Sequence, residues 1–153
     1  PLLVGATGPR MLRLVARHAQ QWNQWSAPGE FAATSATLDS ACEKEGRDPA
    51  TMWRSTQAVM IVAESPETEA RAKSAAEKLQ MPTVYGTPAR IAEAVAVWRD
   101  EGVDEVIVPD FGLPKGPERL DAFRALADAF APLSDRAAKS AASRERMTGF
   151  EPV

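Results

Sequence analysis

The sequence has few of the side chains that most often bind metals, form disulfides or act as nucleophiles. Its 153 residues include one cysteine, Cys42, and one histidine, His18. A single cysteine excludes an internal disulfide and suits a reducing compartment, so we expect a cytoplasmic protein. Cys42 falls on the apolar side of a predicted helix, where we expect it to belong to the core. His18 falls near a predicted helix C-terminus, where it favours the helix dipole. We predict no metal site.

Long hydrophobic runs and an excess of positive charge are also absent. No apolar run approaches the roughly 20 residues that a membrane-spanning helix needs. The net charge of −3 gives the chain no general attraction to nucleic acid or to an anionic membrane. The composition, 44% hydrophobic and 25% charged, is typical of a soluble globular domain. We therefore expect a small-molecule substrate as the partner, and neither nucleic acid nor a membrane.

The most informative stretch is the first one, where an apolar run is followed by two glycines and a proline. Leu2–Val4 reads as a short strand buried on both faces. Gly5 and Gly8 permit a sharp turn, and Pro9 suits the first position of a helix. The unpaired N–H groups at a helix start form a site for an anion such as phosphate. The turn is either a cofactor phosphate site or an ordinary tight loop whose glycines save space.

The rest of the chain alternates between strand and helix patterns. The expected elements are a helix over Pro9–Gln20, a strand over Gln21–Trp25, a helix capped by Ser26, opened by Pro28 and ended by Gly46, a strand over Ser55–Val62, a helix over Pro66–Leu79, a helix from the Thr87 cap to Gly102, a strand over Val103–Val108 and a helix over Pro117–Ala131. Residues 134–153 are polar and rich in alanine, and we expect a weakly ordered tail.

Alternating strands and helices predict a parallel sheet whose strands end at one common face. Sites of α/β proteins form at that face. The Gly5–Gly8 turn, the strand end over Trp22–Trp25 and the Pro109–Phe111 segment should all lie there. Trp22 and Asn23 either line a pocket or belong to the core and a turn. Asp110 is the best candidate for an acid or base, but a loop carboxylate more often caps backbone N–H groups, so the catalytic residues stay unassigned.

Three segments together resemble the luciferase-like monooxygenase family of flavin- and deazaflavin-dependent oxidoreductases. They are PLLVGATGPRMLRLVARHA at residues 1–19, leading into Trp22 and Asn23, YGTPARIAEAV at residues 85–95, and EGVDEVIVPDF at residues 101–111. The resemblance covers residues 1–133 and is strongest to the members that use coenzyme F420.

The resemblance implies an α/β chain that forms the C-terminal half of a TIM-type (β/α)8 barrel, with four parallel strands and outer helices. A complete barrel takes about 250 residues, so either an N-terminal half is missing or two copies pair, and we expect a homodimer. It also implies that the turn formed by Gly5, Ala6, Thr7, Gly8 and Pro9, with Arg10 beside it, holds the phosphate end of the cofactor. Trp22 and Asn23 would line the cofactor or substrate pocket.

The function that this resemblance implies is hydride transfer between F420 and an organic substrate. An FMN-dependent monooxygenase is the first alternative. A non-catalytic half-barrel that binds at most phosphate-bearing ligands is the second, and it is favoured by the short chain. A flavodoxin-like open sheet would fit the alternation of strands and helices but not the three segments.

Overall fold

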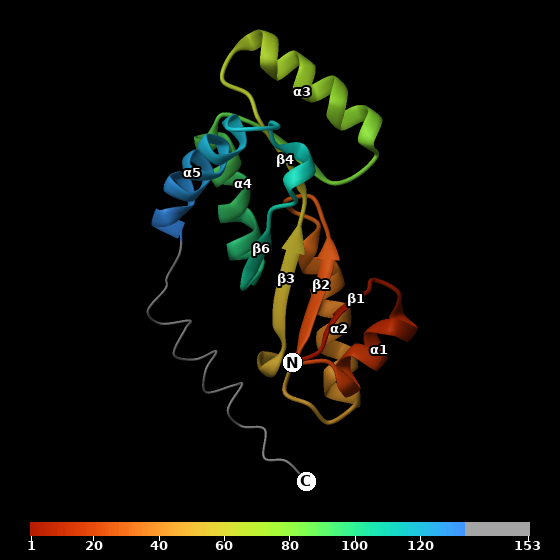
Figure 1. The fold of residues 1–153 in the computed structure, drawn as a ribbon. Coiled ribbons are helices and arrows are strands. Elements are labelled where there is room, and N and C mark those ends of the chain that lie inside the picture. Colours follow the sequence, from red (N-terminus) through yellow and green to blue (C-terminus); the bar gives the residue numbers. More distant parts are fainter. Residues whose placement is uncertain (134–153) are drawn as a thin grey trace.

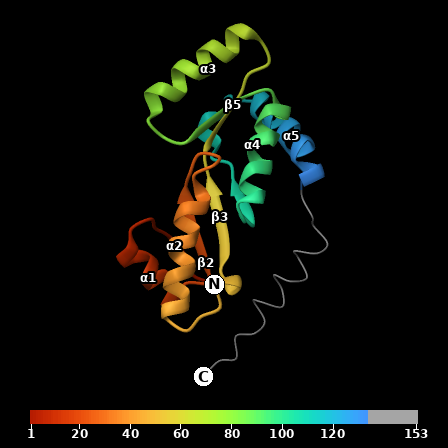
Figure 2. The same cartoon turned by 180° about the vertical axis from the view of Figure 1, so that it is seen from behind.

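A computed structural model describes residues 1–133 of the chain (Figures 1 and 2). The prediction for residues 134–153 lies outside the described part. The elements, in order, are β1 (Leu3–Gly5), α1 (Pro9–His18), β2 (Gln21–Trp25), α2 (Phe31–Lys44), η1 (Pro49–Thr51), β3 (Trp53–Gln57), β4 (Val59–Val62), α3 (Pro66–Leu79), β5 (Thr83–Gly86), α4 (Pro88–Asp100), β6 (Glu105–Ile107), η2 (Asp110–Gly112), α5 (Glu118–Phe130) and η3 (Ala131–Leu133).

The main sheet contains four strands in the order β1-β2-β3-β6, and all neighbours are parallel. In the register, Gly5 lies opposite Asn23, Asn23 opposite Ser55, and Ser55 opposite Glu105. Each strand is therefore followed by a connection that returns to the starting edge, as parallel pairing requires. The sequence predicted this four-stranded parallel arrangement correctly.

The predicted strand over Ser55–Val62 is wrong as a single element, because the chain passes from one sheet to another within it. β3 ends at Gln57, and β4 begins at Val59 after Ala58. β4 pairs in parallel with β5, a strand that the sequence analysis missed, in a separate two-stranded sheet. Pairing between segments this far apart in the chain leaves no local signal, and Pro82 and Gly86 made the short segment between them look like a connection.

The helices α1 and α2 cover one face of the main sheet. In Figure 2 α2 lies in front of β2 and β3, whereas in Figure 1 the opposite face of these strands is turned to the viewer and no helix of residues 1–133 crosses it. The contacts agree, since Trp22 packs against Phe31 of α2 with ring centroids 5.1 Å apart. Side chains alternate along a strand, so Asn23 and Trp25 point to the face without the helices.

The core lies between this sheet and its helices. Its fully buried members include Trp22, Phe31, Leu12, Leu38, Met52, Ile91 and Trp98. Cys42 is buried among them, as predicted, and burial raises the pKa of its thiol. A neutral buried thiol packs as a small apolar side chain and is a poor nucleophile.

The start of α2 differs from the prediction. The helix begins at Phe31, not near Pro28, and Ser26 does not cap it. The Ser26 hydroxyl is buried and lies 2.7 Å from the Thr56 hydroxyl of β3. Ser26 therefore links the ends of two neighbouring strands, and this non-local contact outweighs its local preference for a helix cap.

The first strand is also more exposed than expected. Leu2 and Leu3 are 50% and 42% exposed, although the sequence predicted burial on both faces. β1 is an edge strand that pairs with β2 alone. The apolar run Leu2–Val4 therefore has a neighbour on one side only.

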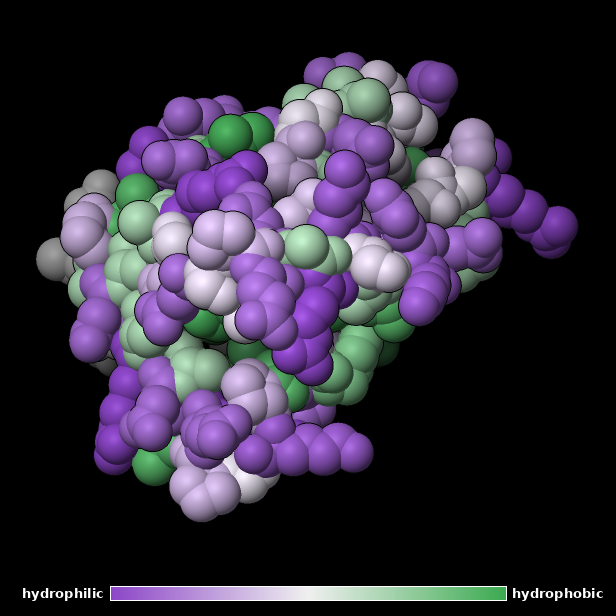
Figure 3. All heavy atoms as spheres, turned by 90° about the horizontal axis from the view of Figure 1, so that it is seen from above, coloured by the Kyte–Doolittle hydropathy of each residue, from purple (hydrophilic) through white to green (hydrophobic). Residues whose placement is uncertain are grey.

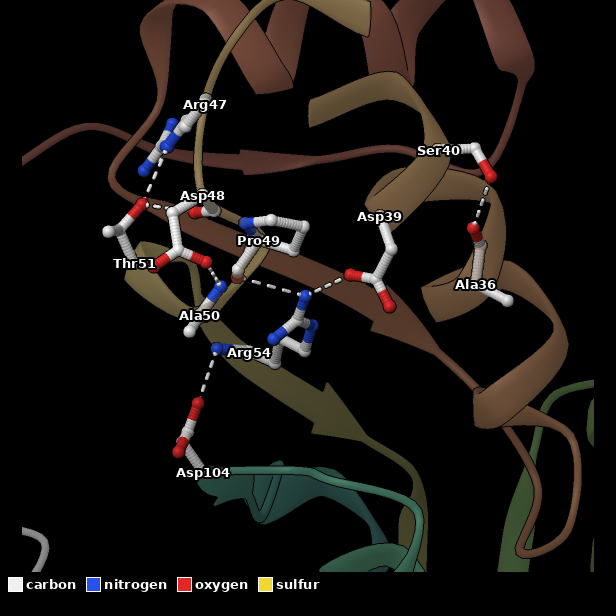
Figure 4. A network of polar contacts seen from close by, with 10 residues as sticks. All are labelled: Ala36, Asp39, Ser40, Arg47, Asp48, Pro49, Ala50, Thr51, Arg54 and Asp104. Carbon is white, nitrogen blue, oxygen red and sulfur yellow. Dashed lines mark hydrogen bonds and ion pairs between the residues drawn. The ribbon is translucent and has the colours of Figure 1, made fainter. Parts of the chain in front are cut away.

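A polar network ties the helix layer to the amino end of the sheet (Figure 4). The Arg54 guanidinium pairs with Asp39 of α2 and donates to the Pro49 carbonyl at 3.2 Å. The Arg54 backbone N–H donates to the Asp104 carboxylate at 2.9 Å. These contacts fix α2, η1, β3 and the start of β6 relative to one another, at the edge opposite the predicted site.

Gly112 is the position where the fold most clearly needs a glycine. A β-carbon there would lie 2.5 Å from Val59 Cγ1 and 2.6 Å from the Met60 carbonyl oxygen of β4. We expect Gly112→Ala to lower the free energy of unfolding by about 1–3 kcal/mol, the usual cost of overpacking. The measurement is a urea titration followed by circular dichroism.

Gly5→Ala is the matched control, because a β-carbon at Gly5 would lie at an ordinary contact distance, 3.9 Å from the Asn23 carbonyl oxygen, and Gly5 has no positive φ. Its stability should stay close to that of the wild type. Equal stability of Gly112→Ala and the wild type would show that η2 does not pack on β4 as described.

Candidate functional site at the carboxyl edge of the sheet

The loop between β1 and α1 is held from beneath by β2. The Ala6 N–H donates to the Asn23 carbonyl at 3.2 Å, and the Trp22 indole Nε1 donates to the Ala6 carbonyl at 2.7 Å. Both polar groups of Ala6 are therefore used to fasten the loop to its neighbour. The residues after it, Thr7 to Arg10, remain exposed at the carboxyl edge of the sheet.

Neither the turn nor the packing of residues 1–133 requires the two glycines of this loop. Neither has a positive φ, so the turn itself does not require glycine at these positions. A β-carbon at Gly5 would lie 3.9 Å from the nearest heavy atom, and one at Gly8 would have none within 4 Å. Packing within residues 1–133 does not require them either. The open space above Gly8 leaves room for an external group to approach the backbone closely.

The first turn of α1 has free hydrogen-bond donors. The first helical bond runs from the Leu12 N–H to the Gly8 carbonyl at 2.9 Å. The N–H groups of Gly8, Arg10 and Met11 precede it and have no acceptor among the described residues, and all three residues are exposed. The positive end of the helix dipole lies at the same place.

Arg10 differs from Arg13 and Arg17, the other two arginines of α1. Arg13 and Arg17 bind the same carboxylate, with Nε atoms 2.7 and 2.5 Å from the two oxygens of Glu45. Arg10 has no ion-pair partner in residues 1–133, and it lies in the first turn beside the free N–H groups. Its positive charge therefore remains available to an anion at the loop.

The predicted pocket residues Trp22 and Asn23 point to opposite faces of the sheet. Trp22 is fully buried under α2 and cannot line a pocket, which corrects the prediction for this residue. Asn23 lies on the face without helices, where its Nδ2 donates to the Ser55 hydroxyl at 2.9 Å. Alternation along the strand made one of the two residues a core residue, and the sequence alone did not indicate which.

Trp25 lies at the end of β2, within the strand end that the sequence placed at this edge. Its ring centroid lies 6.4 Å from that of Phe111, in η2 after β6. The neighbouring Asp110 forms an ion pair with Arg119 at 2.7 Å. Asp110 thus fixes its loop through an ion pair, and not by capping loop N–H groups as its structural interpretation expected.

Two other features belong to the helix layer. Helices of parallel α/β units run back along the strands, so α1 starts at the carboxyl edge and ends with His18 at the amino edge. A groove of about 650 Å³ between α1 and α2 extends from Pro9, at the start of α1, to Lys44 and Glu45 near the end of α2. Figure 3 views the molecule from above, with the carboxyl ends of β2 and β3 towards the viewer. It shows a largely hydrophilic surface with hydrophobic side chains between the polar ones.

The chain belongs to the luciferase-like monooxygenase family, whose model matches residues 1–83. Among curated proteins, none matches the sequence. Solved structures of luciferase-like TIM-barrel enzymes share its fold, so the predicted half-barrel is confirmed.

Three such structures illustrate the range of this likeness. The coenzyme F420-dependent tetrahydromethanopterin reductase from Methanopyrus kandleri is 16% identical, with a TM-score of 0.65 over 87% of this chain and 50% of its own. An F420-dependent secondary alcohol dehydrogenase in complex with an F420–acetone adduct is 13% identical, with a TM-score of 0.65 over 84% and 48%. Riboflavin lyase with modified FMN is 13% identical, with a TM-score of 0.67 over 86% and 43%. The chain therefore spans about half the length of the structures it matches.

Residues 1–133 contain neither a cluster of metal ligands nor a helix suited to a membrane. No group of three or more histidine, cysteine, aspartate or glutamate side chains is placed to hold a metal ion in this part of the chain. None of its helices combines the length and apolar character that crossing a bilayer demands.

The ion pairs of Glu45 with Arg13 and Arg17 should make the stability of the fold depend on pH. Hydrogen bonds from Arg17 and then Arg13 lower the pKa of the Glu45 carboxyl below its ordinary value of 4.5. The ion pairs therefore stabilise the folded state above that pH, and this contribution is lost as the pH falls through the lowered pKa. We expect Glu45→Gln to lower the urea midpoint near neutral pH, with a difference from wild type that shrinks in acid.

Glu43→Gln is the control, since Glu43 is exposed and has no ion pair within residues 1–133. It should leave the urea midpoint unchanged at each pH. A Glu45→Gln effect of equal size in acid and at neutral pH would contradict the assignment to the carboxylate charge.

Proposed function

We propose that the chain forms the C-terminal half of a deazaflavin- or flavin-dependent oxidoreductase and that the loop between β1 and α1 binds the phosphate end of the cofactor. The observation that carries the proposal is the exposed first turn of α1, with the free N–H groups of Gly8, Arg10 and Met11, no neighbour above Gly8 and the unpaired guanidinium of Arg10. Membership of the luciferase-like monooxygenase family supports it.

The proposed cofactor is coenzyme F420, and FMN is the alternative. The names of the structural neighbours include both, so the likeness favours a flavin-type cofactor without selecting one. When bound, F420 would supply hydride transfer to or from an organic substrate. The residues of this chain would bind and orient it.

Each part of the loop has a distinct task in this proposal. The N–H groups donate to phosphate oxygens, and the helix dipole and Arg10 favour their negative charge. Trp22 fixes the loop through its hydrogen bond to the Ala6 carbonyl. Asn23, on the opposite face of the same strand, would contribute a polar group to the pocket. We assign no acid or base, because Asp110 is paired with Arg119.

A carboxylate at Gly8 tests the phosphate site directly. Gly8→Asp should weaken binding of F420, FMN and inorganic phosphate at least tenfold, because it places a negative charge where the phosphate charge would lie. The variant should fold normally, since the added side chain meets open space. Isothermal titration calorimetry of the purified chain measures the effect.

Gly8→Asn is the matched control, with the same shape and no charge, and it should bind more tightly than Gly8→Asp. Arg10→Gln should weaken phosphate binding less than Gly8→Asp, because the backbone donors remain. If the wild-type chain binds none of the three ligands, or if Gly8→Asp binds them equally well, the loop is an ordinary connection and the non-catalytic half-barrel is the better description.

We also propose that a second half-barrel completes the structure, and that in the isolated chain this is a second copy. β1 and β6 are the outermost strands of the main sheet and each has one unpaired edge. The elements next to these strands in the chain also expose apolar side chains: Leu2, Leu3, Met11 and Leu14 in or beside β1 and α1, and Leu120 and Phe123 in α5, the helix that follows β6 and η2. Unpaired edges with apolar flanks favour association.

A charge within one of these flanks should prevent the assembly. The wild-type chain is expected to be a dimer by native mass spectrometry, and Leu14→Glu should shift it towards monomer. Leu79→Glu, at an exposed apolar position at the end of α3, should leave the dimer intact. A wild-type chain that is monomeric at all concentrations would contradict pairing with a second copy.

A further inference from the structure

Two aromatic side chains meet at the carboxyl edge of the main sheet, and the loop that binds phosphate does not use them. Trp25 is the last residue of β2, and Phe111 lies in η2, beyond the end of β6. Their ring centroids are 6.4 Å apart with an angle of 32° between the ring planes. Phe111 is 57% exposed, the largest exposed fraction among the large hydrophobic side chains described.

The exposure of Phe111 is built into its loop. On one side of it, Gly112 lies so close to β4 that a β-carbon would collide with Val59 and with the Met60 carbonyl. On the other side, Asp110 pairs with Arg119 at 2.7 Å, and Arg119 Nε donates to the Pro114 carbonyl at 3.0 Å. Both neighbours of Phe111 are therefore fixed, and the ring is held at the surface beside Trp25.

The surroundings of the pair are mixed in polarity. In the sheet register Trp25 lies opposite Gln57, and Gln57 lies opposite Ile107, so these three side chains share the face without helices. All three are partly exposed. Small-molecule sites typically combine apolar and aromatic walls with a few polar groups. Here Gln57 supplies an amide between an indole ring and an aliphatic side chain.

We propose that Trp25 and Phe111 form an aromatic wall of the substrate pocket and select an organic substrate with an apolar, planar or ring-bearing part. This inference rests on the proposed function. Two observations favour a substrate over a second protein surface as the occupant. Phe111 belongs to a loop beyond a strand end, where α/β barrels open to ligands, and not to the strand segments that would face the barrel interior. Gln57 and Ile107, in register with Trp25, also give this face the mixture of polar and apolar groups that small-molecule sites have.

The probe for this wall is 1-naphthol, a neutral planar molecule that contains no phosphate. We expect it to bind the full 153-residue chain saturably in a calorimetric titration. Phe111→Ala should weaken the binding about five- to tenfold, the effect of losing one aromatic contact. The substitution should not unfold the chain, because most of the Phe111 side chain is already exposed.

Val97→Ala is the matched control. Val97 is an exposed apolar residue, 41% accessible, near the C-terminal end of α4 and therefore far from the carboxyl edge of the sheet. It should bind naphthol like the wild type. Inorganic phosphate is titrated into the same preparations, and Phe111→Ala should bind it with unchanged affinity. A wild-type chain that does not bind phosphate would refute the phosphate site of the proposed function. The naphthol titrations of the wild type and the variants test only the aromatic wall.

Four results would overturn the inference. The first is a wild-type chain that does not bind naphthol saturably, and the second is a Phe111→Ala variant that binds it as tightly as the wild type. The third is displacement of naphthol by FMN or F420 at saturating concentration, which would assign the wall to the cofactor ring. The fourth is a change in native mass caused by Phe111→Ala, which would show that the wall is covered by another copy of the chain.

Discussion

The parallel direction of the four main strands is the constraint on which the rest of this structure depends. Because β1, β2, β3 and β6 all run the same way, each connection must return along the outside of the sheet, and the chain does this with helices. The same constraint brings the loop after β1, the end of β2 and the loop after β6 to one edge. The loop after β1 and Phe111 of η2, which are far apart in the sequence, thereby lie at the same edge of the sheet as Trp25.

Within that frame, β2 connects the core to the candidate site. Trp22 fills the space under α2 and at the same time donates its indole hydrogen to the Ala6 carbonyl, so the packing of the core sets the position of the loop. Asn23 and Trp25 point the other way, one bonded to Ser55 and one in contact with Phe111. A five-residue strand thus serves the core on one face and the site on the other, and a shift by one residue would exchange the two sets.

Local signals made much of the fold predictable from the sequence. α3 has the predicted bounds Pro66–Leu79, with a capping box of Ser65 and Thr68 at its start. Thr87 caps α4 as predicted, and the alternation of strands and helices indicated the parallel sheet. Features that depend on distant partners were not predictable. β5 exists because it pairs with β4, Ser26 bonds to Thr56 instead of capping α2, and the burial of Trp22 depends on which face the helices cover. At the site, the sequence indicated the loop and the strand end, but only the structure shows that neither the turn nor the packing of residues 1–133 requires a glycine at position 8 and that Phe111 stands against Trp25.

The distribution of ionisable groups indicates what this half of a barrel can contribute to chemistry. His18 lies at the amino edge, at the end of a helix that starts at the carboxyl edge, and the burial of Cys42 raises the pKa of its thiol. Asp110 lies at the correct edge, but Arg119 holds it in an ion pair. The described residues at the carboxyl edge therefore offer hydrogen-bond donors, one unpaired arginine and aromatic surface, all of which bind and orient. In a cofactor-dependent oxidoreductase such groups are sufficient for one half of the site, because the cofactor itself carries the redox chemistry. Any proton transfer would then depend on residues that the other half-barrel brings to the same edge.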